Sequence, residues 1–271
     1  VGAIGTLMPV NMQQSVADAL AALSERVGDI DAFVAKELGY ERSALGGFFG
    51  AEQVDALALA IDSMNRDAGF VIGDQTGIGK GRVVAGVIRW ALKNGKTPIF
   101  VTEKPNLYGD MYRDLTDIGV TDIRPVMTNQ SEKIPLNEDG SVELRPMPRH
   151  NEALRTLADS GRLEDANIIF TTYSQMQFLK GAATVRNDFL ARFAEGGVVI
   201  FDESHNAGGQ EASSRNKKKG EDEAKKDGRA GFARRIAGSA SAVFYSSATW
   251  AKRPEVMDLY FKTDMALLVR G

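Results

Sequence analysis

The chain has 271 residues, of which 43% are hydrophobic, enough for one large domain or for one domain with a small helical extension. The formal net charge of −3 provides no overall basic field, so any nucleic-acid contact has to be built from local loops. The sequence has no cysteine and only two histidines, His150 and His205, which argues against disulfide frameworks and zinc sites and fits a reducing compartment. No apolar run approaches the ~20 residues of a membrane helix, so we expect no membrane contact.

The amino-terminal part of the chain predicts helices and no targeting signal. It starts without a charged segment followed by an apolar stretch, and the absent initiator methionine suggests a fragment or a processed chain. Apolar residues recur at helical spacing within residues 11–39. Asn11 can cap a first helix, Gly28 can end it, and Gly39 can end a second. We interpret residues 1–47 as a helical extension that packs on the main domain.

Predicted helices and short apolar strands alternate from residue 51 onwards. The strands are continuous β-branched or aromatic runs, as expected for strands that are buried on both faces of a parallel sheet. This alternation predicts an α/β fold with a mostly parallel sheet that helices cover on both faces. The predicted helices span residues 51–64, 80–93 and 107–118, and the predicted strands span 70–72, 98–102, 167–172, 198–201 and 243–246.

Two polar segments interrupt this pattern. Residues 128–149 contain Asn137-Glu138-Asp139-Gly140, which can turn a hairpin between Ile134 and residues 142–144. Residues 211–228 are a mixed charge run without apolar periodicity, which favours a solvated loop and leaves a loop that touches nucleic acid as the alternative. The main domain is predicted to span residues 48–271, with polar insertions near 128–165 and 207–228.

The strongest motif is GDQTGIGKGR at residues 73–82, which follows a predicted strand and opens a predicted helix, as a phosphate-binding loop requires. The glycines let successive amides point inward, and together with the helix N-terminus these amides bind an anion. Lys80 supplies a positive charge for the β- and γ-phosphates of ATP. A purely structural turn is the alternative. The predicted nucleotide contacts are Thr76, Gly77, Ile78, Gly79, Lys80, Gly81 and Arg82.

The loop departs from the general P-loop pattern at two positions. Asp74 replaces the first glycine, a change that loops of the helicase type tolerate. Gly81 stands where a serine or threonine hydroxyl normally holds Mg²⁺. The ion therefore has to rely on water and on a carboxylate elsewhere in the chain.

That carboxylate is expected in Asp202-Glu203, directly after the apolar strand 198–201. Ligands of open α/β sheets bind at the carboxyl ends of the strands. There Asp202 can hold Mg²⁺ through water, and Glu203 can orient and deprotonate the attacking water. Lys80, Asp202 and Glu203 are the predicted catalytic residues, and an acidic turn at the end of a strand is the alternative.

Three further residues are predicted to couple the nucleotide site to its surroundings. His205 completes a D-E-x-H pattern and is expected to link the site to a partner lobe, with a purely structural histidine as the alternative. Ser247 and Thr249 belong to Ser247-Ala248-Thr249, which follows another apolar strand and can hydrogen-bond to the D-E-x-H segment.

The motifs GDQTGIGKGR, FDESH and SSAT occur in superfamily 2 order and resemble the Strawberry notch family of helicase-like ATPases. The GKGR form of the loop is typical of that family, and VTEKPNLYGDMYRDLTDIG resembles it as well. The resemblance covers roughly residues 8–271. It implies an RecA-like lobe, and it suggests relatives in bacteria, phages and plasmids that place this module beside an adenine methyltransferase in restriction or anti-restriction settings.

The resemblance also implies further site residues. Gln53 matches a glutamine that reads adenine through its amide, with an ordinary helix-start glutamine as the alternative. Two loops fall where the family contacts the nucleic-acid backbone, which positions a strand without reading its sequence. Capping or packing roles are the alternatives there. The loops contain Thr102, Lys104 and Asn106 after one strand, and Thr171, Thr172 and Tyr173 after another.

We therefore expect the first ATP-binding lobe of a superfamily 2 helicase or translocase, using ATP and Mg²⁺ and acting on nucleic acid, with double-stranded DNA as the favoured substrate. Only residues 250–271 follow SSAT, so a second RecA-like lobe with an arginine finger is expected elsewhere in the parent chain, and this chain alone should hydrolyse ATP slowly or not at all. The expected location is the cytoplasm of a bacterial or phage-infected cell, with a virion as an alternative. A nucleotide-gated DNA- or protein-binding scaffold is the rival function, and a small-molecule kinase fits the motif order less well.

Overall fold

The computed structural model describes residues 10–72, 78–177, 182–203 and 219–246. Six of its strands form one sheet in the order β1-β8-β7-β2-β6-β3, and every pairing in it is parallel. The predicted α/β, RecA-like architecture is therefore confirmed. The strands are β1 (Gly69–Ile72), β2 (Pro98–Thr102), β3 (Pro125–Met127), β6 (Ile168–Thr172), β7 (Val198–Phe201) and β8 (Ala242–Ser246).

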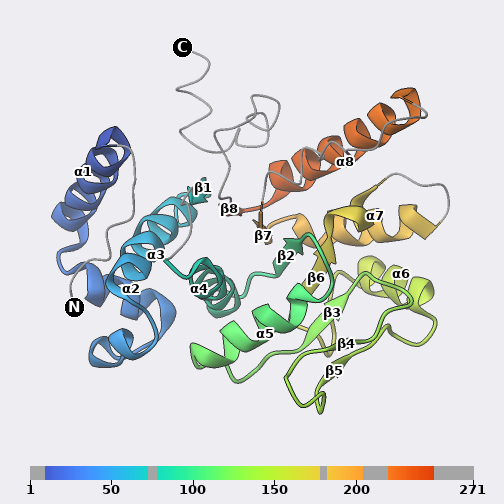
Figure 1. Cartoon of the computed structure of the whole chain (residues 1–271), viewed down its shortest axis with the longest axis horizontal. Helices are drawn as coiled ribbons and strands as arrows, with labels where there is room; N and C mark the ends of the chain where they lie inside the picture. The colour runs from blue at the N-terminus through green and yellow to red at the C-terminus, as the bar shows by residue number, and fades with distance from the viewer. Residues whose placement is uncertain (1–9, 73–77, 178–181, 204–218, 247–271) are drawn as a thin grey trace.

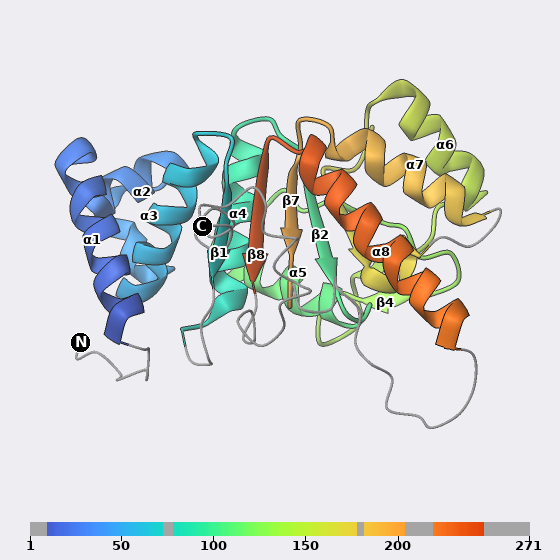
Figure 2. The same ribbon diagram turned by 90° about the horizontal axis from the view of Figure 1, so that it is seen from above.

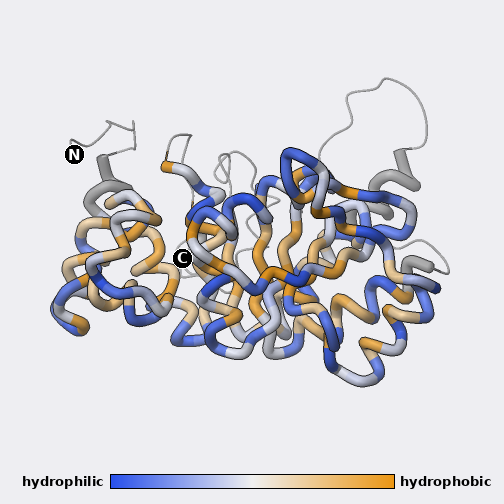
Figure 3. Tube along the Cα trace, turned by 90° about the horizontal axis from the view of Figure 1, so that it is seen from below, coloured by the Kyte–Doolittle hydropathy of each residue, from blue (hydrophilic) through white to orange (hydrophobic). Residues whose placement is uncertain are grey.

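Helices cover both faces of the sheet, on opposite sides of the row of strands (Figures 1 and 2). Alternate strand residues enter two separate cores: Phe100 of β2 packs with the layer of α3, α4 and α5, whereas Ile99 and Val101 pack with the layer of α6, α7 and α8. This explains why the strands consist mainly of apolar residues, which contribute to the orange stretches of the tube in Figure 3, although β2, β6 and β8 end in threonine or serine. The helices are α3 (Ala51–Met64), α4 (Lys80–Lys93), α5 (Leu107–Asp117), α6 (His150–Ser160), α7 (Ala182–Ala194) and α8 (Lys219–Ser239).

The amino-terminal helices are α1 (Val10–Val27) and α2 (Ile30–Leu38), followed by the 3-10 helix η1 (Arg42–Gly47). Gly28 and Gly39 have φ of +79° and +75°, which confirms them as the residues that end the two helices. The predicted cap at Asn11 is wrong, because α1 already includes Val10. The spacing of apolar residues predicts which face of a helix is buried, but it does not determine the residue at which the helix begins. The extension shares one apolar core with α3 and α4 through Leu23, Val34, Leu38 and Leu45.

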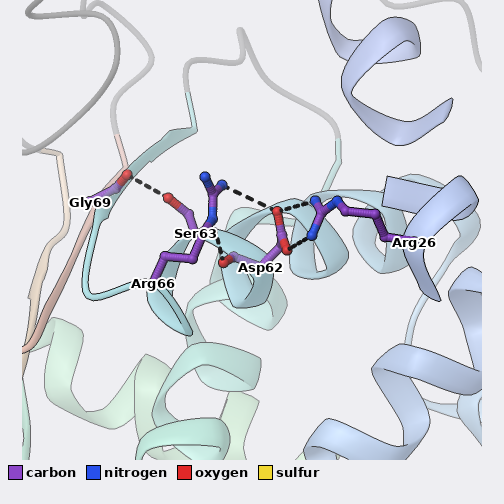
Figure 4. A network of polar contacts seen from close by, with 5 residues as sticks. All are labelled: Arg26, Asp62, Ser63, Arg66 and Gly69. Atoms are coloured by element: carbon purple, nitrogen blue, oxygen red, sulfur yellow. Dashed lines mark hydrogen bonds and ion pairs between the residues drawn. The ribbon is translucent and has the colours of Figure 1, made fainter. Parts of the chain in front are cut away.

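A polar network ties α1 to α3 and α3 to β1 (Figure 4). The Arg26 guanidinium donates to both carboxylate oxygens of Asp62, at 3.0 and 2.9 Å. Arg66 donates to the same carboxylate at 3.2 Å, and the Ser63 hydroxyl donates to the Gly69 carbonyl at 2.9 Å. The hydrogen bond from Arg26 lowers the pKa of Asp62, against the opposing effect of partial burial.

The predicted hairpin is confirmed by β4 (Ile134–Pro135) and β5 (Glu143–Leu144), which pair antiparallel. Gly140 has φ of +68°, and the Asn137 side-chain oxygen accepts a hydrogen bond from the Val142 amide at 3.0 Å. The turn residues therefore close this insertion in the way that their chemistry predicts.

The charged run 211–228 differs in part from the predicted loop. Part of it lies outside the described residues, but α8 begins at Lys219, so its second half is helical and the predicted loop is wrong there. Phe232, Ala233 and Ile236 anchor the carboxyl-terminal half of α8 in the core. Lysine, glutamate and alanine are good helix formers, so the anchored helix extends backwards through a segment that has no apolar face of its own.

Among the helices that the structure describes, none combines the length and the apolar character that crossing a bilayer demands.

Candidate nucleotide-binding and catalytic site

The phosphate-binding loop joins the carboxyl end of β1 to the start of α4. Its first part, residues 73–77, lies outside the described residues and includes Thr76 and Gly77. Gly79 has φ of +72°, and a β-carbon there would lie 2.4 Å from the side-chain nitrogen of Gln53. The backbone angle therefore favours glycine at position 79, and a β-carbon there would also push the Gln53 amide out of its present position. Lys80 follows as the first residue of α4, the predicted context for a phosphate-binding lysine.

Gln53 holds the loop in place from the start of α3. Its side-chain Nε2 donates to the carbonyl of Ile78 at 2.7 Å and to that of Gly79 at 3.3 Å. Its Oε1 accepts from the Gly50 amide at 2.9 Å. Both ends of the amide are therefore engaged with backbone groups, and the adenine contact stays a prediction that would require one of these bonds to open.

Gly81, which replaces the usual hydroxyl residue, is packed against α5. A β-carbon at this position would lie 2.3 Å from Oδ2 of Asp114. Burial raises the pKa of the Asp114 carboxyl, and the nearby Arg113 charge opposes that rise. Any side chain at position 81 would therefore have to displace the Asp114 carboxylate, a side chain that no larger residue at this position obstructs in the present sequence.

Arg82, a predicted nucleotide contact, donates to the Phe48 carbonyl at 2.7 Å and lies 4.0 Å from the Asp117 carboxylate. These partners connect α4 to the segment before α3 and to α5. The nucleotide contact of Arg82 stays a prediction.

Asp202 follows β7 and is held at three of its atoms. Its amide donates to the Val101 carbonyl at 2.8 Å, and its Oδ2 accepts from the Thr102 hydroxyl at 3.0 Å. Its carbonyl accepts from the Tyr173 hydroxyl at 2.6 Å. The ends of β2 and β6 therefore fix both the backbone and the carboxylate of this residue.

Burial raises the pKa of Asp202 to about 6. The Thr102 hydrogen bond and the Lys80 charge act in the opposite direction, while the neighbouring Glu203 charge adds to the rise. A cation beside this carboxylate would offset its desolvation, so the site favours positive charge.

The donor set fits the magnesium complex of a nucleotide. Within the described residues there is no group of three or more histidine, aspartate or glutamate side chains that could hold a metal. Mg²⁺ at nucleotide sites takes one or two carboxylates and completes its octahedron with phosphate oxygens and water. A single buried Asp202, at the same edge as Lys80, agrees with that arrangement.

Glu203 has φ of +47°, in the left-handed region. This conformation costs a residue other than glycine on the order of 1–3 kcal/mol and persists only where its surroundings impose it. Such residues gather at active sites, and this one is the residue that the sequence analysis assigns to water activation. His205, Ser247 and Thr249, the predicted coupling residues, lie outside the described residues.

The residues that the resemblance assigns to nucleic-acid contact divide into two groups. Lys104 and Asn106 are exposed beyond the end of β2. Thr102 and Thr172 are fully buried and Tyr173 is 2% exposed. Thr102 and Tyr173 bond to Asp202, Thr171 bonds to Thr128 at 2.7 Å, and Thr172 bonds to Ser174 at 3.0 Å. In this structure only the exposed pair presents its side chains to solvent.

Sequence reasoning did not identify Thr102 and Tyr173 as partners of Asp202, or Asp114 as the neighbour of Gly81. The glycine at position 81 indicates a missing magnesium ligand in the sequence, but it does not identify the side chain that lies beside it. The partners of Asp202 carried no signal in the sequence, because the order of strands in the sheet decides which strand ends meet.

Comparisons with known proteins agree with this geometry. A family model described as "P-loop containing NTP hydrolase pore-1" matches residues 36–267. The chain is 30% identical over 150 residues to Protein strawberry notch of Drosophila melanogaster, covering 52% of this chain and 8% of that protein.

Two other relatives show a similar likeness. The chain is 29% identical over 185 residues to Protein strawberry notch homolog 1 of Homo sapiens, covering 62% of this chain and 12% of that protein. It is 28% identical over 144 residues to Protein FORGETTER 1 of Arabidopsis thaliana, covering 52% of this chain and 10% of that protein. The chain thus spans only about a tenth of the length of these relatives.

Proposed function

We propose, because this chain belongs to the P-loop containing NTP hydrolase pore-1 family, that it is the first motor lobe of an ATP-dependent, nucleic-acid-stimulated helicase or translocase. The observation that carries the proposal is the arrangement at one edge of the sheet. Lys80 opens α4 after β1, and buried Asp202 and strained Glu203 follow β7 at the same edge. This is the arrangement of a P-loop ATPase.

Each residue of this arrangement has a distinct task. Lys80 attracts the β- and γ-phosphates, and the amides at the start of α4 bind the same oxygens. Asp202 would hold Mg²⁺, which when bound supplies charge neutralisation of the phosphates. Glu203 orients the attacking water and accepts its proton, so it is the base of the proposed reaction.

The nucleic-acid part of the proposal is supported by motif order and by the exposed residues Lys104 and Asn106. An exposed lysine next to an amide side chain suits phosphate oxygens and makes no base-specific contact. Double-stranded DNA is the proposed substrate, and a second RecA-like lobe elsewhere in the parent chain is the proposed partner. His205, Ser247 and Thr249 are the proposed coupling residues. The methyltransferase neighbour, the anti-restriction role, and the cytoplasmic or virion location remain proposals that stand on the resemblance alone.

A nucleotide-gated scaffold is the second candidate, and Gly81 is the observation that favours it. With no hydroxyl at this position, and with Asp114 packed against it, the site has one magnesium ligand fewer than the usual P-loop. Against it stands Glu203, because a switch that never hydrolyses its nucleotide does not need a base beside the magnesium carboxylate.

The two functions are separated by the ATPase rate of the full-length protein, with and without double-stranded DNA, in the wild type and in Glu203→Gln. A helicase or translocase lobe predicts a DNA-stimulated rate that Glu203→Gln removes while nucleotide binding persists. A matched control is Glu138→Gln in the exposed β4–β5 hairpin, which should leave the rate unchanged. Background rates in the wild type, with ATP still bound, would favour the scaffold.

A further inference from the structure

Tyr173 reaches from the end of β6 to the backbone of the predicted catalytic pair. It opens the 3-10 helix η2 (Tyr173–Met176), and its hydroxyl donates to the Asp202 carbonyl at 2.6 Å. That carbonyl belongs to the peptide unit that joins Asp202 to Glu203. The left-handed turn of Glu203, with φ of +47°, begins at the same peptide unit. The hydrogen bond therefore holds the plane of the Asp202–Glu203 peptide in one orientation, and the left-handed φ of Glu203 follows directly after that plane.

The tyrosine ring is itself held firmly. It is 2% exposed and stacks on Phe201 of β7, with centroids 6.4 Å apart and an interplanar angle of 12°. Phe201 in turn stacks on Tyr245 of β8 at 5.5 Å and 13°. Because this column of rings is part of the core, the Tyr173 hydroxyl cannot leave the Asp202 carbonyl without disturbing the packing.

Other contacts fix Asp202, and one of them involves the next residue, because the Glu203 backbone N–H donates to the Asp202 carboxylate. The Val101 carbonyl accepts from the Asp202 amide, and the Thr102 hydroxyl donates to the Asp202 carboxylate. Both act on the β2 side of Asp202. A left-handed residue that is not glycine needs an external restraint to keep its conformation. Two contacts act on the peptide leading into Glu203: the Glu203 amide donates to the Asp202 carboxylate, and the Tyr173 hydroxyl, which comes from another strand, donates to the Asp202 carbonyl.

We propose that Tyr173 is a positioning residue for Glu203: its hydroxyl fixes the Asp202–Glu203 peptide in the left-handed turn and thereby sets the direction in which the Glu203 side chain leaves β7. This role rests on the proposed ATPase function, in which Glu203 activates water. It also replaces direct contact with nucleic acid as the role of Tyr173, since the side chain is buried against its own sheet.

The test is Tyr173→Phe in the full-length protein, which removes the hydroxyl and keeps the ring. We expect kcat for ATP to fall about 10-fold, equivalent to about 1.4 kcal/mol, in the absence and in the presence of DNA. The KM for ATP, nucleotide affinity and the DNA concentration that gives half-maximal stimulation should not change. In a Glu203→Gln background the same change should lower the residual rate no further, because residues that act as a unit are non-additive.

Tyr108→Phe is the matched control. The Tyr108 side chain is fully buried, and its hydroxyl donates to Asn129 at 2.7 Å. Both variants remove one buried tyrosine hydroxyl from the same lobe, so a similar loss of stability is expected for both, but only Tyr173→Phe should lower kcat.

The alternatives give different results. If only the DNA dependence changes, Tyr173 contacts nucleic acid and the inference is overturned. If both variants lose stability and neither loses kcat, the hydroxyl is merely structural and the inference is again overturned. A wild-type protein without turnover would overturn the proposed function and this inference together, whereas wild-type turnover in Tyr173→Phe would overturn the inference alone.

Discussion

Asp62 in α3 and Asp202 after β7 use a carboxylate in opposite ways. The Asp62 carboxylate accepts a hydrogen bond from each terminal nitrogen of the Arg26 guanidinium, and these hydrogen bonds lower the pKa of Asp62. Asp202 is buried at the sheet edge, where it accepts the Thr102 hydroxyl, and burial raises its pKa to about 6. The ionised form is favoured by folding at the first residue and disfavoured at the second.

The difference in pKa separates a carboxylate with a structural role, Asp62, from a carboxylate of the proposed catalytic site, Asp202. The Asp62 charge meets its counter-charge within the protein, so it helps to fasten the helical extension to the lobe. The Asp202 charge is desolvated before any ligand arrives, so the folded chain carries a cost that a bound cation would offset. Next to it, Glu203 adds a strained backbone. The strained backbone of Glu203 beside the raised pKa of Asp202 supports the proposal that this sheet edge is the functional region.

The largest expected effect tests the functional side of this comparison. Asp202→Asn keeps an oxygen that can accept from Thr102 but loses the charge that Mg²⁺ requires. We expect the DNA-stimulated ATPase rate of the full-length protein to fall about 100-fold or more. Asp62→Asn is the control and should leave the rate unchanged. Equal rates in the wild type and in Asp202→Asn would show that another carboxylate holds the ion.

The second prediction concerns stability in metal-free buffer. Because the pKa of Asp202 is raised in the folded state, its favourable contribution is complete below the unfolded value near 3.8 and is lost as the pH rises through about 6. Asparagine does not ionise, so Asp202→Asn avoids the loss of stability that the wild type suffers when this carboxyl ionises in the folded state. The variant should therefore be more stable than the wild type by about 2–3 kcal/mol at pH 8, with the difference shrinking below pH 6. Urea unfolding over this pH range measures it, and a less stable variant at pH 8 would contradict the prediction.

The third prediction uses Gly81 and Asp114. Gly81→Thr should lower the free energy of unfolding by about 1–3 kcal/mol, because its β-carbon would collide with the Asp114 carboxylate. Adding Asp114→Ala should recover most of that loss in a double-mutant cycle. Gly231→Thr in α8 is a suitable control, because a β-carbon there meets nothing within 4 Å. Additive effects of the Gly81 and Asp114 changes would show that the two positions do not compete for space.

The smallest expected effect tests the structural side. The pKa of Asp62 is lowered, so its contribution to stability is present above the unfolded value near 3.8 and is lost as the pH falls through the folded value. Asp62→Asn should destabilise the protein modestly at neutral pH, because the Arg26 side of the ion pair is 56% exposed and solvent screens the charges, and the difference should vanish in acid. Thermal unfolding at pH 7 and pH 3 checks the sign, which is the reverse of that for Asp202→Asn.

Several elements could be predicted because their information is local. The helices 51–64 and 80–93 and the strands 98–102 and 198–201 have the predicted bounds, and the hairpin forms around Gly140. Apolar periodicity, β-branched runs and turn residues depend on only a few neighbouring residues, so they predict local structure without knowledge of the fold.

The failures occur where distant contacts decide. Helices α6 and α7 and strand β3 were not predicted, and the charged start of α8 was predicted as a loop. Leu154 of α6 and Phe189 of α7 gain their burial by packing into the same core layer, and neither segment reveals that partner locally. Tertiary packing overrides weak local preferences in such segments.

The sequence by itself determined the α/β class, the phosphate-binding loop at Lys80 and the carboxylate pair after an apolar strand, because each depends on residues adjacent in the chain. Only the tertiary structure decided that β7 pairs with β2, with β6 next in the sheet, so that Thr102 and Tyr173 meet Asp202, and that Asp114 fills the space beside Gly81. The physical reason is that the strand order of a parallel sheet is set by helical crossovers and their packing, which bring together residues as far apart as Thr102 and Asp202.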